Sequence, residues 1–380
     1  MKKLIPYGHQ WIDDKDIKEV VKVLRTDWIT QGPKIEEFER AVAKYCGAKY
    51  AVAVSSGTAA LQAAYTVAGI KPGDEVITTP LTFAATVYTL TFLGGKPVFA
   101  DIKEDTLNID LKEIEKKITN KTKAIAPVDF AGQPCDYEEI LKIAKTHKLL
   151  VIEDAAQALG AEYQGKKIGS FADLTILSFH PVKTITTGEG GMVVTSNKNF
   201  YKKLKIFRHH GIVKKPEKGG WYYEIENLGH NFRITDFQCA LGLSQLKKIN
   251  KFLKRRREIV AKYNKAFKEI KEIVLPIEKK ERKSAWHIYI IQLSLEKLKA
   301  NRKEIFEAFQ KEGIGAQVHY LPLHLQPFFK KKFGYKLGNF PIAERYYQRA
   351  ITLPLFPKMT NRDVNKVIEV VKKTINFYKK

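Results

Sequence analysis

Short apolar runs alternate with helical patterns along the first half of the chain. Seven runs rich in β-branched and apolar residues have the length of buried strands, and they fall at residues 50–54, 75–79, 97–101, 123–128, 149–153, 174–179 and 191–195. Helical spacing follows the first of them, at residues 59–67. Strands that alternate with helices predict a largely parallel sheet that binds ligands at the carboxyl ends of its strands. The last strands follow one another after short loops, so we expect part of the sheet to be antiparallel.

The second half of the chain has a different pattern. Residues 246–267 are lysine-rich with helical spacing, which indicates a long connecting helix, and residues 285–293 alternate like a strand. Residues 301–313 and 362–380 have the pattern of amphipathic helices. A length of 380 residues suits two domains. The predicted fold class is therefore α/β, with a large domain over residues 1–245 built on a mostly parallel seven-stranded sheet and a smaller α+β domain over residues 246–380.

Composition excludes several classes of protein. No apolar run is long enough to span a bilayer, and Pro6 interrupts the amino-terminal run before a signal-peptide core could form, so we expect a cytoplasmic protein without a membrane partner. The three cysteines, Cys46, Cys135 and Cys239, are widely spaced and have no zinc-ligand pattern around them. We therefore expect reduced thiols and no metal site.

The formal net charge of +25 raises the hypothesis of a nucleic-acid partner, because a basic surface releases counterions from a phosphate backbone. The lysines are scattered, however, and many stand beside glutamates, as in residues 278–283. The sequence has no basic arm and no RNA-binding aromatic signature. We therefore expect a solvated lysine-rich surface and no nucleic-acid partner, with a positive field that attracts anionic substrates.

Candidate chemistry lies at the ends of two predicted strands. Asp154 ends an apolar run, and Lys183 lies roughly thirty residues later in a loop of small and hydroxyl residues that precedes a glycine cluster at 188–191. A lysine that holds an aldehyde cofactor as a Schiff base, and an acid that keeps a pyridine ring protonated, are expected at the ends of strands in one sheet. This pair predicts a pyridoxal 5'-phosphate (PLP) enzyme. The alternatives are a surface lysine and an aspartate that caps a helix beginning at Ala155.

Three further segments offer groups for a ligand. Ser56, Gly57 and Thr58 follow a strand and begin a helix, which suits a phosphate, although a plain helix cap has the same pattern. Phe83 follows another strand and could stack on a cofactor ring or be an ordinary core residue. The run 318–324 holds two histidines and a tyrosine but lacks acidic or cysteine partners, so contact with a sugar or nucleotide is more plausible there than a metal.

Together these runs resemble the DegT/DnrJ/EryC1/StrS family of PLP-dependent sugar-nucleotide aminotransferases, which have fold type I. The resemblance extends over nearly the whole chain, from the run 28–33 to the run 317–320. It implies pyridoxal 5'-phosphate as cofactor, L-glutamate and a nucleotide sugar as substrates, and a homodimer with active sites shared between the subunits. Lys183 stands where some members have histidine and dehydrate deoxysugars, so transamination is the implied reaction.

The resemblance also implies residue roles. Lys183 matches the Schiff-base lysine and Asp154 the partner of the pyridinium nitrogen, and these two are the catalytic residues. The implied cofactor-binding residues are Ser56, Gly57, Thr58, Phe83, Asp154, Gln157, Ser178, Lys183 and Asn231, the last from the other subunit. The implied substrate-binding residues are Tyr7, Trp28, Ile29, Thr30, Gln31, Ser56, Ser178, Asn231, Gln317, Val318, His319 and Tyr320.

Within the family the chain resembles the aminotransferases of pseudaminic acid biosynthesis, through Asp129 and through the runs 208–215, 228–233 and 240–248. This implies amination at C4 of a UDP-linked 4-keto-6-deoxy-N-acetyl-hexose. Gln157 departs from the subgroup, where histidine stands. The alternative is a 4-aminotransferase for another nucleotide-linked ketosugar, such as a UDP-linked pentose or a dTDP- or GDP-linked hexose.

Overall fold

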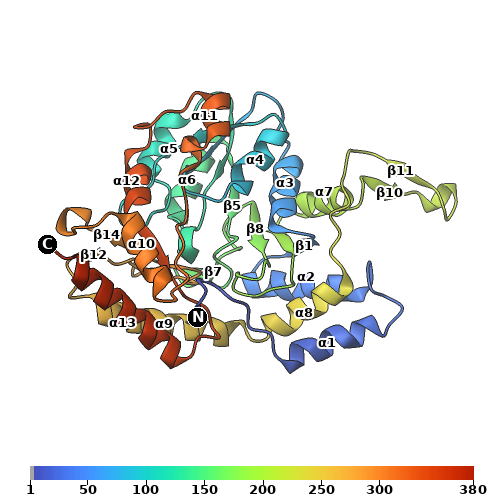
Figure 1. Cartoon of the computed structure of the whole chain (residues 1–380). Helices are drawn as coiled ribbons and strands as arrows, with labels where there is room; N and C mark the ends of the chain where they lie inside the picture. Colours follow the sequence, from blue (N-terminus) through green and yellow to red (C-terminus); the bar gives the residue numbers. More distant parts are fainter. Residues whose placement is uncertain (1–3) are drawn as a thin grey trace.

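A seven-stranded sheet forms the centre of the protein, which the computed structural model describes over residues 4–380 (Figure 1). The strands are β1 (Tyr50–Val54), β2 (Glu75–Thr78), β3 (Lys96–Phe99), β4 (Thr122–Ala126), β5 (Leu150–Asp154), β8 (Leu174–Ser178) and β9 (Gly191–Thr195). They lie in the order β1-β9-β8-β5-β4-β2-β3. Neighbours from β8 to β3 are parallel, whereas β9 is antiparallel to both β1 and β8. The predicted sheet, including its antiparallel part, is confirmed.

Helices cover both faces of this sheet because alternate strand residues are apolar on both sides. Ala51 and Ala53 of β1 belong to one buried cluster, and Val52 and Val54 belong to the other. The helices packed on the first face are α2 (Pro33–Cys46), α6 (Tyr137–His147) and α8 (Asp236–Leu246). Those on the second face are α3 (Gly57–Val67), α4 (Ala85–Phe92) and α7 (Lys198–Arg208). Helix α1 (Asp14–Leu24) lies beside α8 (Figure 1).

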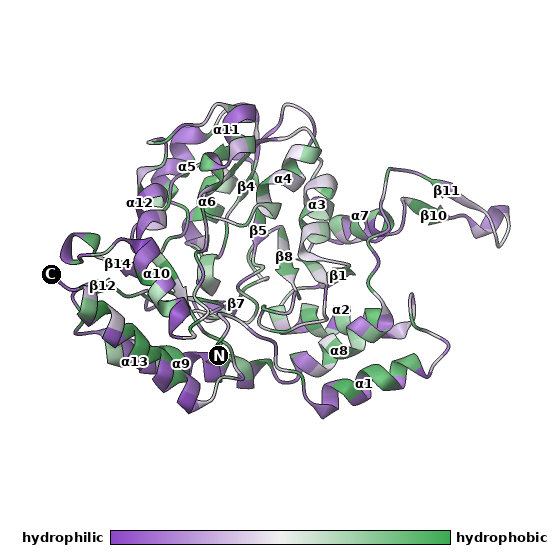
Figure 2. Cartoon of the chain, viewed as in Figure 1, coloured by the Kyte–Doolittle hydropathy of each residue, from purple (hydrophilic) through white to green (hydrophobic). Residues whose placement is uncertain are grey.

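A second hydrophobic core is formed by the later part of the chain. Its antiparallel sheet contains β12 (Ile273–Val274), β14 (Tyr289–Leu293) and β15 (Ala350–Leu353). Its helices are α9 (Ile249–Phe267), α10 (Arg302–Lys311) and α13 (Asn361–Tyr378). Figure 2 shows the mixture of hydrophilic and hydrophobic positions along α13 that an amphipathic helix requires. The division of the chain at residue 245 stays a prediction.

Two predicted elements differ from the structure in their extent. The helix predicted over residues 246–267 is α9, which begins only at Ile249 because Leu246 is the last residue of α8. The strand predicted over residues 285–293 is only β14. Residues 285–288 do not pair with the small sheet. The N–H groups of Ala285 and His287 donate instead to the carbonyls of Gly132 and Ala131, at 2.9 Å each, in the segment that follows β4.

The remaining elements lie around these two cores. A hairpin of β10 (Ile212–Lys214) and β11 (Tyr223–Ile225) projects away from the rest of the chain (Figure 1). The other elements are α5 (Leu111–Lys117), α11 (Pro327–Phe333), α12 (Pro341–Arg349), β6 (Glu162–Tyr163), β7 (Lys166–Lys167) and β13 (Arg282–Lys283). Within residues 4–380, no helix combines the length and the apolar character needed to cross a membrane.

Candidate active site

Lys183 lies in the turn that joins β8 to β9, at the carboxyl end of the sheet's central strands. Its backbone N–H donates to the His180 carbonyl at 2.9 Å, which closes the turn. Burial of the side chain lowers the pKa of its amine from 10.5 to about 8, and the negative charge of Asp154 opposes this shift. The unprotonated form of the amine is therefore far more populated near neutral pH than in an ordinary lysine, which favours a nucleophilic role.

Asp154 is the last residue of β5, and its carboxylate interacts electrostatically with the Lys183 amine. Its carboxylate accepts hydrogen bonds from Thr86 Oγ1 at 2.6 Å and from the Ala156 N–H at 3.1 Å. Burial raises the pKa of Asp154, whereas these two hydrogen bonds and the charge of Lys183 lower it. Residues 156–160 form turns and not the helix that a purely capping role for Asp154 would require. The arrangement is a buried carboxylate, held by fixed donors, beside an amine.

The first turn of α3 forms a cradle of backbone and hydroxyl groups next to the end of β8. Ser56 is its N-cap, and Ser56 Oγ accepts from the Ala59 N–H at 3.0 Å. A Cβ atom at Gly57 would lie 3.0 Å from the Ser178 Cβ, so glycine permits the helix start to approach Ser178 closely. The N–H groups of Gly57 and Thr58 have no acceptor within the helix, which together with the hydroxyl groups suits a phosphate.

Gln157 connects two parts of the site. Its Oε1 accepts from the Ala131 N–H at 2.7 Å, and its Nε2 donates to Tyr320 Oη at 3.1 Å. The Tyr320 ring lies 6.1 Å from the ring of Phe83 and 6.2 Å from that of Phe130, measured between centroids. Phe83 is 56% exposed, so it is not an ordinary core residue, and its ring is free to contact a flat ligand.

The run from Gln317 to Tyr320 places further groups near Lys183. His319 Nδ1 hydrogen-bonds with Thr352 Oγ1 at 2.8 Å, and its ring lies 5.2 Å from that of Tyr7. Burial and then the charge of Lys183 lower the pKa of His319 to about 4, so the imidazole stays neutral. Gln317 pairs with Thr352 through the backbone. Val318 is half-buried and donates its N–H to Gln317 Oε1 at 2.9 Å.

Five predicted substrate- or cofactor-binding residues form a separate group: Trp28, Ile29, Thr30, Gln31 and Asn231. In the part of the chain that the structure describes, none of them makes a hydrogen bond or ring contact with Lys183 or Asp154. Thr30 pairs with Thr235, and Asn231 pairs with His209 at the base of the projecting hairpin. Trp28 and Ile29 are exposed.

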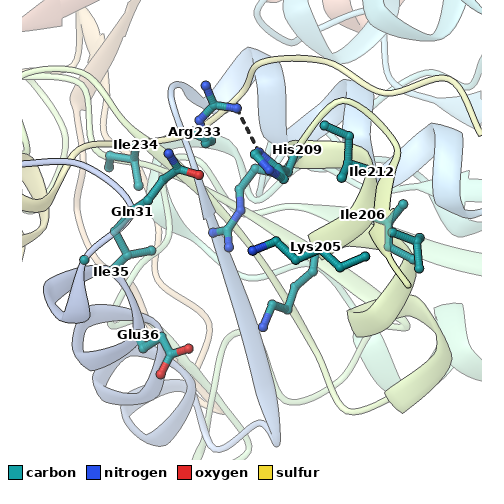
Figure 3. A pocket seen from close by; sticks show the side chains of 13 residues that line it. Gln31, Ile35, Glu36, Lys205, Ile206, His209, Ile212, Arg233 and Ile234 are labelled. Atoms are coloured by element: carbon teal, nitrogen blue, oxygen red, sulfur yellow. Dashed lines mark hydrogen bonds between the residues drawn. The ribbon is translucent and has the colours of Figure 1, made fainter. Parts of the chain in front are cut away.

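Gln31 lines a cavity of about 580 Å³ at this base, shown in Figure 3. Its charged lining residues are the basic Lys205, Arg208, Lys214 and Arg233 and the acidic Glu36, and His209 lies beside them. Arg233 Nη1 and His209 Nδ1 lie 2.9 Å apart. Burial and the charge of Arg233 lower the pKa of His209, which favours a neutral ring that accepts this hydrogen bond. The cavity therefore has a positive field suited to an anion.

Two groups of the site were not found from the sequence. Thr86 lies in α4 three residues after Phe83, and its sequence signal is weak because the same apolar helix also contains Thr89 and Thr91. The other is the backbone N–H of Ala131, which holds Gln157. Every residue type except proline has a backbone N–H, so no sequence signal could have found it.

Comparisons with known proteins extend over nearly the whole chain. The sequence pattern of the DegT/DnrJ/EryC1/StrS aminotransferase family matches residues 10–372. The spore coat polysaccharide biosynthesis protein SpsC of Bacillus subtilis is 44% identical over 97% of this chain and 96% of that protein. The UDP-4-amino-4,6-dideoxy-N-acetyl-beta-L-altrosamine transaminase of Campylobacter jejuni is 42% identical over 99% of each chain.

A solved structure agrees with these relatives. Helicobacter pylori PseC, an aminotransferase involved in the biosynthesis of pseudoaminic acid, has a TM-score of 0.94 to this chain at 37% identity. The likeness covers 99% of this chain and 100% of PseC. The family match, the relatives and the shared architecture lead to one conclusion: this chain belongs to the DegT/DnrJ/EryC1/StrS aminotransferase family and is a PLP-dependent aminotransferase of fold type I.

Proposed function

We propose that this enzyme transfers the amino group of L-glutamate to C4 of a UDP-linked 4-keto-6-deoxy-N-acetyl-hexose, as in pseudaminic acid biosynthesis. The observation that carries the reaction is the Lys183 amine, whose pKa is lowered to about 8 beside the buried carboxylate of Asp154. The sugar is supported by full-length likeness to the Campylobacter transaminase. Cytoplasmic location is part of the same proposal.

The residues around Lys183 fit the cofactor. When bound, PLP supplies a protonated ring that accepts electrons from the carbon that loses its proton. Lys183 would hold the cofactor and then act as base and acid at that carbon. Asp154 would keep the ring nitrogen protonated, because its own hydrogen bonds from Thr86 and Ala156 stabilise the charged carboxylate.

Other groups would hold the remaining parts of PLP. The Ser56, Gly57 and Thr58 segment would bind the phosphate with Ser178, since a helix start with uncapped N–H groups favours an anion. The exposed Phe83 ring would contact the face of the pyridine ring.

Other groups of the site would contact the cofactor's phenolic oxygen and the sugar nucleotide. Gln157 would contact the phenolic oxygen, through the Nε2 group that now reaches Tyr320. Tyr7 and the run from Gln317 to Tyr320 would contact the sugar nucleotide, because His319 connects both to the surroundings of Lys183.

We propose that Trp28 to Gln31 and Asn231 act in the active site of a second copy of the chain. They lie near the hairpin that projects from the body, and residues in and beside this hairpin include Trp221, 84% exposed, and Leu228, 91% exposed. Large apolar side chains that are this exposed are typical of a surface that a partner protein covers. In a homodimer the basic cavity beside Gln31 would then face the diphosphate of the nucleotide sugar.

A second candidate keeps the reaction and changes the sugar. The Bacillus subtilis protein SpsC is as similar to this chain as the Campylobacter enzyme, and its name refers to spore coat polysaccharide. This observation favours a 4-aminotransferase for another nucleotide-linked ketosugar as the alternative.

The absorbance spectrum of the PLP-loaded protein distinguishes these possibilities. L-glutamate and a panel of amino-sugar nucleotides, which act as donors in the reverse direction, are added one at a time. We expect the visible cofactor band to disappear with L-glutamate and, among the sugars, selectively with the UDP-4-amino-altrosamine compound. If the band disappears with L-glutamate and with a different sugar, the proposed sugar substrate is wrong and the proposed reaction stands. If no amine changes the band, both the proposed reaction and the proposed substrate are contradicted.

A further inference from the structure

Two carboxylic acids lie together on the face of the sheet opposite to Asp154. Asp129 follows β4, and Glu153 precedes Asp154 in β5. Both side chains are fully buried. Successive residues of a strand point to opposite faces, so Glu153 points toward α6 and Asp154 points toward α4 and the active site.

The hydrogen bonds of these two acids are incomplete. Asp129 Oδ1 accepts from the Cys135 N–H and from Tyr137 Oη, each at 2.8 Å. Glu153 Oε2 accepts from Thr175 Oγ1 at 2.5 Å. The second oxygen of each group, Asp129 Oδ2 and Glu153 Oε1, is buried and receives no hydrogen bond from the N–H and hydroxyl groups of residues 4–380.

One proton between these two oxygens would satisfy both. Two adjacent buried carboxylates cannot both be ionised without a large free-energy cost, and a group with an unpaired buried oxygen carries a further cost. Burial and then the charge of Glu153 raise the pKa of Asp129 well above its usual range. Burial also raises the pKa of Glu153, although hydrogen bonds from Thr175, Tyr137 and Asp129 oppose this. Both shifts favour a single proton held between the two carboxyl groups.

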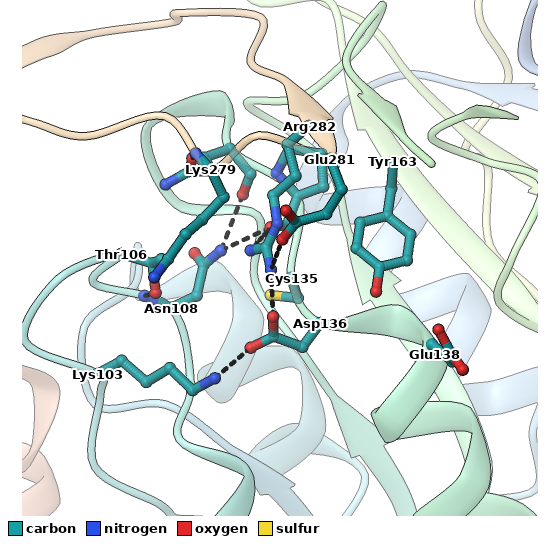
Figure 4. A network of polar contacts seen from close by, with 12 residues as sticks. Lys103, Thr106, Asn108, Cys135, Asp136, Glu138, Tyr163, Lys279, Glu281 and Arg282 are labelled. Atoms are coloured by element: carbon teal, nitrogen blue, oxygen red, sulfur yellow. Dashed lines mark hydrogen bonds and ion pairs between the residues drawn. The ribbon is translucent and has the colours of Figure 1, made fainter. Parts of the chain in front are cut away.

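Asp129 begins a segment, residues 129–136, that many buried groups hold in place. Asn108 Nδ2 donates to the carbonyls of Gln133 and Pro134, at 3.0 Å each. Arg282 donates to the Pro134 carbonyl at 2.7 Å and pairs with Asp136, as Figure 4 shows. The segment is thereby fixed to both halves of the chain, with Asp129 at its start.

The same segment reaches the active site at Ala131. This residue has a left-handed backbone conformation, with φ of 57°, which directs its N–H to Gln157 Oε1 at 2.7 Å. Its carbonyl accepts from the His287 N–H at 2.9 Å. A shift of the segment would therefore release the amide of Gln157 and its contact with Tyr320.

We propose that Asp129 and Glu153 share one proton in the folded enzyme, and that the neutral Asp129 carboxyl group is a positioning residue for the 129–136 segment and hence for Gln157. The effect on the cofactor rests on the proposed function of Gln157 as the neighbour of its phenolic oxygen. The shared proton itself does not depend on that function.

The pH dependence has a definite sign. A carboxyl group whose pKa is raised by folding stabilises the protein fully below its unfolded pKa, and this contribution is lost as the pH rises through the folded value. The other titratable groups that face the pair are Tyr137 from α6, Cys135 from the segment and Cys46 from α2. Burial raises the pKa of all three above their ordinary values, so they keep their protons between about pH 6 and about pH 9.

Two variants of similar size separate the hydrogen bonds from the charge. Asp129→Asn has the shape of the neutral acid: its oxygen accepts from Cys135 and Tyr137, and its NH₂ group donates to Glu153. Asp129→Leu removes both functions. Infrared difference spectroscopy of the full chain at pH 7.5 should show a protonated carboxyl band in the wild type that both variants lack.

Cofactor binding then tests the positioning role. We expect Asp129→Asn to retain the PLP affinity of the wild type. Asp129→Leu should lose about tenfold or more in PLP affinity, as the loss of one fixed contact implies. It should also shift the pH at which the visible band of the PLP-loaded enzyme titrates.

Two results would overturn the proposal. The first is the absence of a protonated carboxyl band that depends on Asp129. This measurement uses no sugar or amino donor, so its outcome is independent of the proposed substrate. The second is equal loss of PLP affinity in both variants. If Asp129→Leu does not fold, melting temperatures decide the matter: the wild type should lose stability relative to Asp129→Asn as the pH rises above the unfolded pKa of an aspartate, about 4, and parallel curves would contradict the shared proton.

Discussion

Removal of one buried hydroxyl group tests how Asp154 is kept ionised. Thr86 Oγ1 donates to Asp154 Oδ2 at 2.6 Å and lies 2.8 Å from Thr82 Oγ1. Thr86 is fully buried, so water has no ready access to take the place of its hydroxyl group in a variant that lacks it. Thr86→Val keeps the shape of the side chain and removes the donor, which leaves Asp154 with the N–H of Ala156 alone.

The size of the effect follows from the geometry. A hydrogen bond to a charged group contributes about 1.5–3 kcal/mol, and one pKa unit corresponds to about 1.4 kcal/mol. Loss of the Thr86 donor should therefore raise the pKa of Asp154 by about 1–2 units. Burial already raises this pKa, so the variant carboxylate would take up a proton closer to neutral pH. Activity that needs the ionised form is lost as the pH falls through the raised value.

The assay is the rate of the glutamate half-reaction at saturating donor, followed by rapid mixing across the pH range. The acid limb of the profile should move to higher pH by about 1–2 units in Thr86→Val. Thr82→Val is the matched control, because it removes a buried hydroxyl group from the same cluster without touching Asp154. An unmoved acid limb in Thr86→Val, or an equal shift in Thr82→Val, would refute the reasoning.

Further predictions concern the cofactor and the subunit contact. Lys183→Ala should lose roughly a thousandfold or more in both half-reactions, measured by single-turnover kinetics, and retained turnover would contradict the assignment. Asp154→Asn should still bind PLP but transfer the proton about 10²-fold more slowly or worse; an unchanged rate would make its role structural. Gly57→Ala should weaken PLP binding roughly tenfold in a fluorescence titration, because its Cβ would lie 3.0 Å from a neighbouring side chain. Trp221→Ala should weaken self-association roughly tenfold or more in sedimentation, whereas Phe377→Ala, another exposed aromatic residue, should not.

The sheet and the residues at its strand ends could be predicted because both depend on local pattern. Most strands of the large sheet are short apolar runs buried on both faces, so their positions can be seen in the sequence. The carboxyl ends of parallel strands meet at one edge of the sheet, which is why Asp154 and Ser178 could be placed near each other. The antiparallel β9 begins at this same edge, opposite Ser178, so the turn with Lys183 that joins β8 to β9 lies there too.

The remaining parts of the site depend on contacts between distant segments. The link from Ala131 to Gln157 uses a backbone N–H in a left-handed conformation, and that conformation is fixed by residues of the second core. The pKa of the Lys183 amine depends on burial that only the packed structure provides. Asn231 pairs with His209 and Gln31 lines the cavity beside it, and the roles proposed for these two residues rest on a second copy of the chain, which no local sequence pattern reveals.

The order Glu153-Asp154 shows how strand register assigns chemistry. Glu153 receives its hydrogen bond from β8 on the α6 face, and Asp154 receives one from α4 on the other face. Their surroundings differ for the same reason: Glu153 meets a second acid, whereas Asp154 meets hydroxyl and N–H donors and the Lys183 amine. A slip of one residue in β5 would exchange the two acids and leave the active site without a correctly placed carboxylate. Parallel pairing of β5 with both β4 and β8 fixes this register, so sheet pairing determines which acid faces Lys183.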